Sequence, residues 1–170
     1  MERTEAQQLI KGGVLTENPS RWADLGCGSG TFTYALASLL PQGSHIHAVD
    51  KRRQRLTNIN TAVDISFEKA DLNTVVLDQD LVGILMANAL HYVKDKATLL
   101  ERLRQYLKPE GRFIIVEYES RRANPWVPYP VEFNALAELC LSLGYSEVTK
   151  IAERPSLYGG TMYSSLILPS

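Results

Sequence analysis

The chain has 170 residues, of which 45% are hydrophobic and 22% charged, and its formal net charge is −1. This length predicts one domain over residues 1–170, with 1–20 as a helical extension before the first strand. The near-neutral charge gives no overall attraction to nucleic acid, and no apolar run approaches the roughly 20 residues that cross a bilayer. The polar N-terminus and two widely separated cysteines, Cys27 and Cys140, predict a cytoplasmic protein without a metal.

Short apolar runs alternate with helical patterns along the chain, which is typical of βα units and a parallel sheet. The expected strands before the last helix are 21–25, 45–49, 65–69, 81–86 and 112–116. The expected helices are 5–11, 31–40, 52–62, one that begins after Asp95, and 132–143. The stretch 71–80 is predicted to be an irregular connector.

The helix after Asp95 is well defined by its pattern, because Asp95 is a good N-cap. Its leucines are predicted to share one face: Leu99, Leu100, Leu103 and Leu107. The chain then ends in two strand-like runs, 147–152 and 162–168, without a helix between them, so they should pair antiparallel.

A glycine-rich turn follows the first strand, where the sequence from position 23 to 32 is ADLGCGSGTF. Glycine permits positive φ and lets a ligand approach the backbone. The turn occupies the carboxyl end of the first strand, where open α/β sheets bind ligands. Gly26, Gly28 and Gly30 therefore predict a ligand-binding turn, although a simple tight turn would also use glycine.

An acidic residue ends each of the next two strands. Asp50 stands where a carboxylate accepts hydrogen bonds from both hydroxyls of a ribose, and Asp71 stands near the height of an adenine edge. A single such residue is more often a helix cap or a turn residue. Together with the glycines, the two indicate an adenosine cofactor.

The residues of the turn distinguish between adenosine cofactors. A dinucleotide fingerprint starting at Gly26 requires a small residue at position 31, where this chain has Thr31. Asp24 would also repel a pyrophosphate, whereas it suits the cationic S-adenosylmethionine. A nicotinamide-dependent oxidoreductase is therefore the weaker alternative.

Residues 24–30 resemble the first motif of class I S-adenosylmethionine-dependent methyltransferases. Asp50 and the pair Asp71-Leu72 are similar to the family's ribose-binding acid and adenine-contacting pair, 84–93 resembles its fourth motif, and 107–112 resembles the turn before its fifth strand. The resemblance covers nearly the whole chain. It implies an α/β, doubly wound, Rossmann-like sheet with strand order 3-2-1-4-5-7-6 and strand 7 antiparallel.

The resemblance also implies a cofactor site. The glycines would surround the methionine portion, Asp24 would lie near its ammonium group, and the backbone of Asn88 and Ala89 would lie under the sulfonium. Cys27 is expected to be a small filler rather than a nucleophile. The full set expected to bind S-adenosylmethionine is Asp24, Gly26, Cys27, Gly28, Gly30, Asp50, Lys51, Asp71, Leu72, Asn88 and Ala89.

Methyl transfer is an in-line displacement, in which positioning supplies much of the rate and a base helps only if the acceptor must lose a proton. His91 is the candidate base, although it could equally pack against the cofactor or face solvent. Glu117 and Glu119 follow the fifth strand and could bind a cationic acceptor or take a proton. The residues expected to bind the acceptor are His91, Glu117, Glu119, Trp126, Tyr129, Arg154 and Tyr158.

The expected acceptor is a small molecule. The Asn/Asp-Pro-Pro-Tyr motif of amino-methylating nucleic-acid enzymes is absent, since residues 88–91 read NALH. The short N-terminal extension predicts an open acceptor pocket, which a partner subunit in a homodimer would complete. The remaining alternative is a non-catalytic nucleotide-binding or partner-binding module, against which the intact glycines and aspartates argue.

Overall fold

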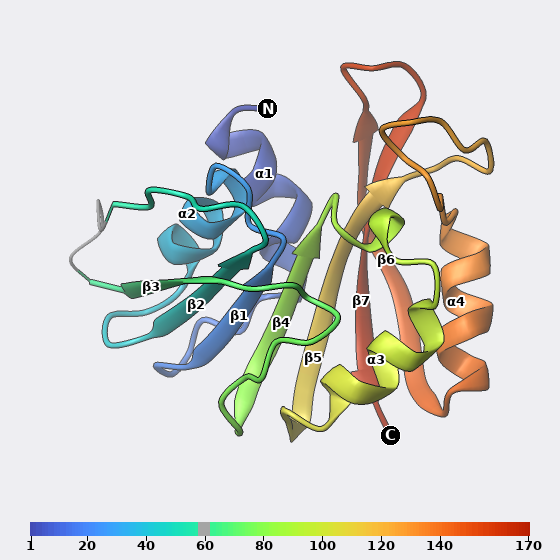
Figure 1. The fold of residues 1–170 in the computed structure, drawn as a ribbon. Helices are drawn as coiled ribbons and strands as arrows, with labels where there is room; N and C mark the ends of the chain where they lie inside the picture. Colours follow the sequence, from blue (N-terminus) through green and yellow to red (C-terminus); the bar gives the residue numbers. More distant parts are fainter. Residues whose placement is uncertain (58–61) are drawn as a thin grey trace.

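A computed structural model describes residues 1–57 and 62–170. Seven strands form one sheet in the order β3-β2-β1-β4-β5-β7-β6 (Figure 1). The strands are β1 (Arg21–Leu25), β2 (His45–Asp50), β3 (Asp64–Lys69), β4 (Leu81–Ala87), β5 (Leu107–Tyr118), β6 (Tyr145–Pro155) and β7 (Thr161–Pro169). The first five are parallel, and β7 runs antiparallel to both β5 and β6. The predicted doubly wound order is confirmed.

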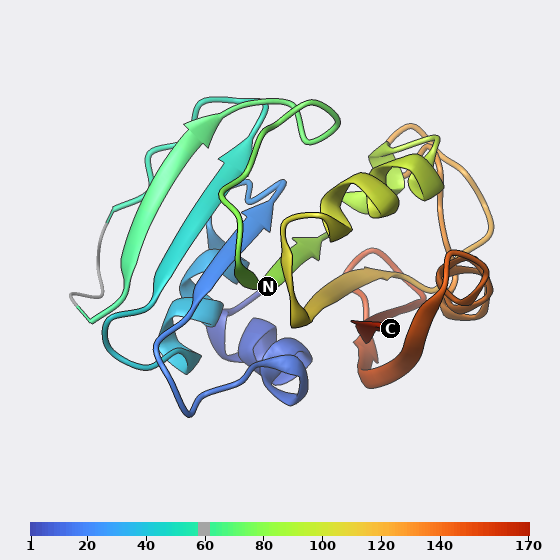
Figure 2. The same cartoon turned by 90° about the horizontal axis from the view of Figure 1, so that it is seen from below.

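Helices cover both faces of this sheet. They are α1 (Arg3–Ile10), α2 (Thr31–Leu39), α3 (Lys96–Arg104) and α4 (Phe133–Ser142), with short 3-10 turns η1 (Lys11–Gly13) and η2 (Leu90–Tyr92). Figure 2 shows α1 and α2 on one face and α3 on the other, and buried side chains of α3 and α4 share one core cluster. The longest helix of the described residues has 10 residues, too few to cross a membrane.

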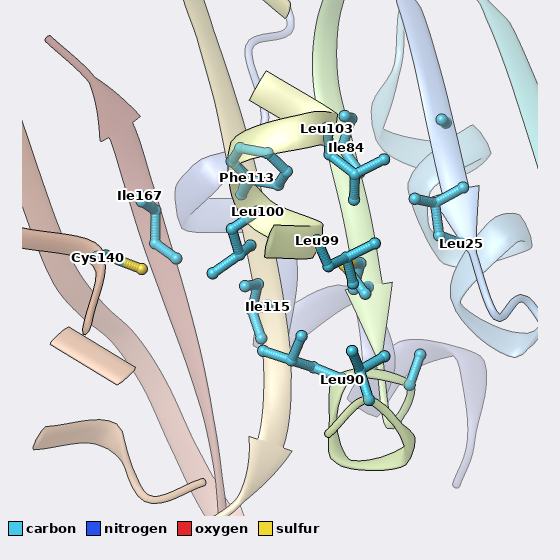
Figure 3. Packing of buried hydrophobic residues seen from close by; sticks show 14 of the residues in the cluster. Leu25, Ile84, Leu90, Leu99, Leu100, Leu103, Phe113, Ile115, Cys140 and Ile167 are labelled. Atoms are coloured by element: carbon cyan, nitrogen blue, oxygen red, sulfur yellow. The ribbon is translucent and has the colours of Figure 1, made fainter. Parts of the chain in front are cut away.

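The core under α3 follows the predicted pattern of leucines. Asp95 caps the helix, its Oδ1 accepting a hydrogen bond from the Thr98 backbone N–H at 3.0 Å. Figure 3 shows Leu99, Leu100 and Leu103 over the side chains of β4 and β5. The prediction that Leu107 belongs to this helix was wrong: the helix ends at Arg104, and Leu107 begins β5 by pairing with Leu81.

On the opposite face, Trp22 of β1 lies fully buried against β4. A Cβ at Gly83 would stand 2.2 Å from its indole ring, so the indole occupies the space that any larger residue at 83 would need. The extension before β1 packs on this face through Ala6, Leu9 and Ile10. The Ser164 hydroxyl of β7 also donates to the Leu9 carbonyl, at 2.5 Å. The N-terminal helix is thus tied to the sheet that carries the site.

The predicted helix over 52–62 is absent from its described part. Residues 52–57 form no helix, and 58–61 lie outside the described residues. The backbone N–H groups of Arg52 and Thr57 donate to side chains, the Asp50 carboxylate and the Tyr34 hydroxyl, rather than to carbonyls one turn earlier. Of the two, the Thr57 N–H is the donor that a helix over 52–62 would direct to the Arg53 carbonyl, so the Tyr34 hydroxyl competes with helix formation there.

Candidate functional site

The glycine turn between β1 and α2 has the left-handed backbone that its sequence predicts. Gly26, Gly28 and Gly30 have φ of 77°, 50° and 92°. The N–H groups of Gly26 and Cys27 both donate to the Val49 carbonyl, at 2.8 and 3.0 Å. A Cβ at Gly26 would stand 2.6 Å from the Cβ of Ala89. The bare backbone at 26 therefore lets the turn approach the end of β4 more closely than any side chain would allow.

Asp50 closes β2 beside this turn. Its two carboxylate oxygens accept the backbone N–H groups of Gly28, at 2.9 Å, and Arg52, at 2.8 Å. These donors fix the orientation of the carboxylate. A carboxylate accepts about four hydrogen bonds, so each oxygen keeps capacity for a further donor, as a pair of adjacent hydroxyls would supply.

A cavity of about 260 Å³ opens at the carboxyl ends of β1 to β4, and we call it the first cavity. Seven of the predicted cofactor residues line it: Gly26, Asp50, Lys51, Asp71, Leu72, Asn88 and Ala89. The other residues that line it are Val49, Ala70, Asn73, Tyr92 and Val93. These five residues were not predicted, although each lies at, or a few residues beyond, the end of a predicted strand.

The remaining predicted cofactor residues, Asp24, Cys27, Gly28 and Gly30, are not among those that line the first cavity. Asp24 is buried under the turn, where its Oδ2 accepts the Thr33 hydroxyl at 2.6 Å. Burial raises the pKa of Asp24 to about 7, the Thr33 hydrogen bond opposes this, and the charge of Asp50 adds to it. Burial also raises the pKa of the Cys27 thiol well above its ordinary value. A raised pKa keeps a thiol neutral, and a neutral thiol is a poor nucleophile, which agrees with the prediction that Cys27 is a filler.

Two further side-chain arrangements shape the rim of the first cavity. Asp71 Oδ1 accepts both the backbone N–H and the side-chain amide of Asn73, at 2.8 and 2.9 Å, which fixes the turn after β3. Lys51 Nζ lies 5.6 Å from the centre of the Tyr92 ring, within cation–π range. The contact between Lys51 and Tyr92 joins the end of β2 to η2, and both residues line the first cavity.

Asn88 follows β4 in an unusual conformation. Its φ is 53°, a left-handed value that asparagine tolerates better than most side chains, and its N–H donates to the Val116 carbonyl at 2.8 Å. Its side-chain Oδ1 is buried without a hydrogen-bond partner. Asn88 lines the first cavity and also a neighbouring one. It therefore stands between two ligand-sized spaces.

The neighbouring space, which we call the second cavity, has a volume of about 250 Å³. It lies where the ends of β4 and β5 meet the β6–β7 hairpin. Its lining includes the predicted acceptor residues Arg154 and Tyr158. The full lining is Met1, Asn88, Tyr118, Arg154, Pro155, Ser156, Leu157, Tyr158 and Met162.

Arg154 is held in place by the N-terminal helix. Its Nη2 donates to Glu5 Oε1 at 2.7 Å, while its Nη1 is buried without a partner. The Arg154 hydrogen bond, helped by the Glu2 backbone N–H, lowers the pKa of Glu5 to about 2. The sequence analysis missed Glu5, because it lies 149 positions from Arg154 and no local pattern joins them.

His91 and Glu117 form a buried pair behind the cavities. The backbone N–H of His91 donates to Glu117 Oε1 at 3.0 Å, and its ring Nδ1 lies 2.7 Å from Oε2. The His91 residue is 2% exposed, and its ring lies near those of Tyr92 and Tyr118, with centres 4.3 and 5.8 Å away. Neither residue of the pair is among those lining the two cavities. The pair joins η2 to β5.

The other predicted acceptor residues, Glu119, Trp126 and Tyr129, line neither cavity. Glu119 accepts the Phe133 N–H at the start of α4, at 2.9 Å, and pairs with Lys150 at 3.1 Å. Trp126 is 80% exposed, and the Tyr129 ring lies 5.8 Å from Lys96 Nζ. Within residues 1–57 and 62–170, no group of three side chains could hold a metal ion.

Comparison with known families matches residues 18–155 to a methyltransferase domain. Among curated proteins, the chain is 33% identical over 95 residues to a trans-aconitate 2-methyltransferase of Pseudomonas paraeruginosa, covering 55% of this chain and 34% of the relative. It is 31% identical over 112 residues to the enzyme of that name from Azoarcus sp., covering 65% and 44%. The matched part thus spans less than half of each relative.

Solved structures share the fold at low sequence identity. A 1,6-didemethyltoxoflavin-N1-methyltransferase from Burkholderia thailandensis aligns with a TM-score of 0.72 and 21% identity, over 99% of this chain and 78% of the other. An S-adenosylmethionine-dependent methyltransferase from Aquifex aeolicus aligns with a TM-score of 0.71 and 17% identity, over 96% and 90%. With the family match over most of its length, the chain belongs to the methyltransferase domain family.

Proposed function

We propose that the chain binds S-adenosylmethionine in the first cavity and transfers its methyl group to a small molecule in the second. The observation that carries the proposal is that the bare backbone of Gly26 and the oriented Asp50 carboxylate line the same cavity at the strand ends. Gly26 has a positive φ, and a Cβ on it would stand 2.6 Å from the Cβ of Ala89. In the same turn, the Gly28 N–H orients the Asp50 carboxylate. A turn of this kind admits a ligand to the backbone at a strand end.

The residues of the first cavity suit the parts of this cofactor. Asp50 retains hydrogen-bonding capacity for the two ribose hydroxyls, and Asp71 and Leu72 line the side expected for adenine. Asp24 supplies a buried carboxylate near the expected position of the ammonium group. When bound, S-adenosylmethionine supplies a methyl group whose bond to sulfur breaks with its electron pair left on sulfur as the acceptor bonds to the methyl carbon.

The second cavity suits the acceptor because it meets the first at Asn88. An in-line displacement needs the acceptor next to the methyl group on the side away from sulfur, and a cavity that adjoins the cofactor cavity at Asn88 supports this placement. The relatives support a small acceptor, since their names refer to trans-aconitate and to 1,6-didemethyltoxoflavin.

His91 and Glu117 act, in this proposal, as positioning residues. Their hydrogen bonds fix η2 against β5 immediately after Asn88, while their side chains stay buried behind the cavity walls. The Tyr129 N–H also donates to the His91 carbonyl, at 2.9 Å, which ties the loop before α4 to the same point. The pair thereby holds the shared wall between the cavities.

Calorimetry with S-adenosylhomocysteine, followed by transfer of a labelled methyl group from S-adenosylmethionine into a metabolite extract, tests the proposal. The wild-type chain should bind S-adenosylhomocysteine and label at least one small molecule. Asp50→Ala should weaken the binding substantially, because it removes the predicted acceptor for the ribose hydroxyls. A folded chain without affinity for either ligand would refute the proposal, and binding without transfer would favour a non-catalytic module.

A further inference from the structure

Exposed apolar side chains gather at the second cavity. Three large apolar side chains that line it are more than a third exposed: Met1 at 38%, Leu157 at 75% and Tyr158 at 88%. Leu157 and Tyr158 belong to the turn that joins β6 to β7. Single exposed apolar residues need no explanation, but a group of them around a cavity marks a surface that a ligand or partner covers.

The turn that carries Leu157 and Tyr158 is held by its own hydrogen bonds. The Ser156 N–H donates to the Gly160 carbonyl at 2.9 Å, and the Tyr158 N–H donates to the Ser156 hydroxyl at 3.1 Å. Gly159 and Gly160 have φ of 87° and 72°, values that glycine adopts without strain. The two exposed side chains are therefore presented by an ordered turn.

The strands beside this turn continue the apolar lining. Tyr118 of β5 and Met162 of β7 are paired across the sheet, and both line the cavity together with Pro155. The half-buried Tyr118 ring lies 5.8 Å from the buried ring of His91, centre to centre. Aromatic rings and thioethers pack well against flat aromatic surfaces. The walls of the second cavity thus suit a flat, apolar molecule.

The basic side chain of the lining is already neutralised. Arg154 Nη2 donates to Glu5 Oε1 at 2.7 Å, and the Glu2 N–H donates to the other oxygen, Oε2, at 2.8 Å. Arg154 Nη1 is buried and offers no donor to the cavity. After Arg154 and the Glu2 N–H, the positive amino group of Met1 also lowers the pKa of Glu5, so this carboxylate stays charged.

These charges disfavour an ionic ligand of either sign. An anion would lose water in the second cavity without gaining a free guanidinium. A cation would find no carboxylate, since none of the described residues lining this cavity is acidic. A neutral ligand avoids both costs.

We propose that the second cavity selects a neutral, flat, mainly apolar acceptor, such as an aromatic ring system, and that Glu5 sets this selectivity by neutralising Arg154. This rests on the proposed function and names its acceptor class. The acceptor covers Leu157 and Tyr158 and lies against Tyr118. Glu5 is among the residues lining neither cavity, so it acts through Arg154 and not by touching the acceptor.

The test measures binding to the whole chain by calorimetry, with and without S-adenosylhomocysteine. The probes are a hydroxynaphthamide, the hydroxynaphthoate with the same substitution pattern, and the saturated decalin analogue of the amide. The hydroxynaphthamide should bind about tenfold more tightly than the hydroxynaphthoate, because the carboxylate is desolvated without a partner. It should bind about fivefold more tightly than the saturated analogue, which cannot stack on the tyrosine rings.

Glu5→Gln tests the role of the ion pair. The variant keeps the length of the side chain and an oxygen that can accept from Arg154, but it removes the compensating charge. The hydroxynaphthoate should gain several-fold in affinity while the hydroxynaphthamide keeps its own, a change of preference that mere loosening of α1 would not produce. Asp78→Asn is the control, because it breaks an exposed pair with Arg21 and lines neither cavity.

Leu157→Ser tests the apolar lining. It should weaken hydroxynaphthamide binding about threefold or more, because it removes apolar area that the ligand covers. Leu141→Ser is the matched control: this leucine of α4 is 54% exposed and lines neither cavity, so affinity should not change. Sedimentation of both variants shows whether either substitution alters association between copies of the chain.

Each result bears on one proposal. No hydroxynaphthamide binding at millimolar concentration, equal binding of the amide and the carboxylate, or a charge preference that survives Glu5→Gln would overturn the inference. A wild-type dimer that Leu157→Ser dissociates would assign the apolar lining to a second copy and overturn it as well. Binding of S-adenosylhomocysteine without the preference keeps the proposed function and loses this acceptor class. The preference without S-adenosylhomocysteine binding keeps the apolar site and loses the proposed function.

Discussion

The two cavities are built in different ways. The first is formed by backbone and short side chains at neighbouring strand ends, and its polar groups, such as Asp50 and Asp71, are already oriented by local N–H donors. The second depends on contacts between distant parts of the chain, such as Glu5 with Arg154, and leaves two polar atoms without partners. The first cavity is thus lined by groups that neighbouring residues orient, whereas the second depends on a contact between distant parts of the chain.

The largest expected effect comes from breaking the first cavity at Gly26. Gly26→Ala adds a Cβ 2.6 Å from that of Ala89 and forces a left-handed conformation that costs about 1–2 kcal/mol. We expect a loss of about a hundredfold or more in affinity for S-adenosylhomocysteine, measured by calorimetry. Gly159→Ala is the matched control, because its φ is 87° but nothing lies within 4 Å of the added Cβ. Equal losses in both variants would show that strain alone, not the close approach, matters.

The next effect tests the wall between the cavities. Glu117→Gln keeps the shape of the side chain but removes the charge facing His91 Nδ1, so stability should fall by about 1–3 kcal/mol in urea unfolding. Glu119→Gln, in a partly exposed pair with Lys150, should cost less than about 1 kcal/mol. If the two variants lose the same stability, the buried pair is not what fixes η2.

Asp24 gives a pH-dependent test of the first cavity. Its pKa of about 7 lies above the ordinary value of 3.8, so the folded chain keeps a proton that the unfolded chain has lost. Its contribution to stability therefore falls as pH rises from near 4 to near 7, and levels off above. A cationic cofactor favours the ionised carboxylate, so affinity for S-adenosylmethionine should rise about tenfold from about pH 6 to about pH 8.

Asp24→Asn is the matched variant, since its amide oxygen can still accept the Thr33 hydroxyl. It should lose both pH dependences, in calorimetry and in thermal unfolding across the same range. Parallel pH profiles in the variant and the wild type would assign the titration to another group.

The contrast between the cavities also explains what the sequence could predict. Gly26, Asp50 and Asp71 were predictable because each follows a strand whose apolar pattern is local, and parallel strands bring their carboxyl ends to one edge. The predicted helix is absent over its described residues 52–57, where the Tyr34 hydroxyl takes the Thr57 backbone N–H. The helix propensity of a local stretch of sequence does not include a hydrogen bond from a side chain more than 20 positions away, such as Tyr34.

The second cavity was predictable only in part. Arg154 and Tyr158 were expected to bind the acceptor, and both line the cavity. Two contacts near the cavity depend on tertiary packing. Arg154 pairs with Glu5, which lies 149 positions away, and His91 pairs with Glu117, which lies 26 positions away. The sequence predicted His91 as the candidate base and both His91 and Glu117 as acceptor residues, whereas the structure pairs them with each other and neither lines a cavity.

The smallest expected effects distinguish two exposed aromatic residues that the sequence treated alike. Trp126 is 80% and Tyr158 88% exposed, so replacing either by alanine should change stability by less than about 0.5 kcal/mol. Tyr158 lines the second cavity and Trp126 does not, so Tyr158→Ala should raise the KM for an acceptor a few-fold, while Trp126→Ala should leave it unchanged. Steady-state kinetics with a labelled acceptor measures both. A raised KM in the Trp126 variant would mean that the loop before α4 closes over the acceptor, and the boundary of the second cavity would then extend beyond the hairpin.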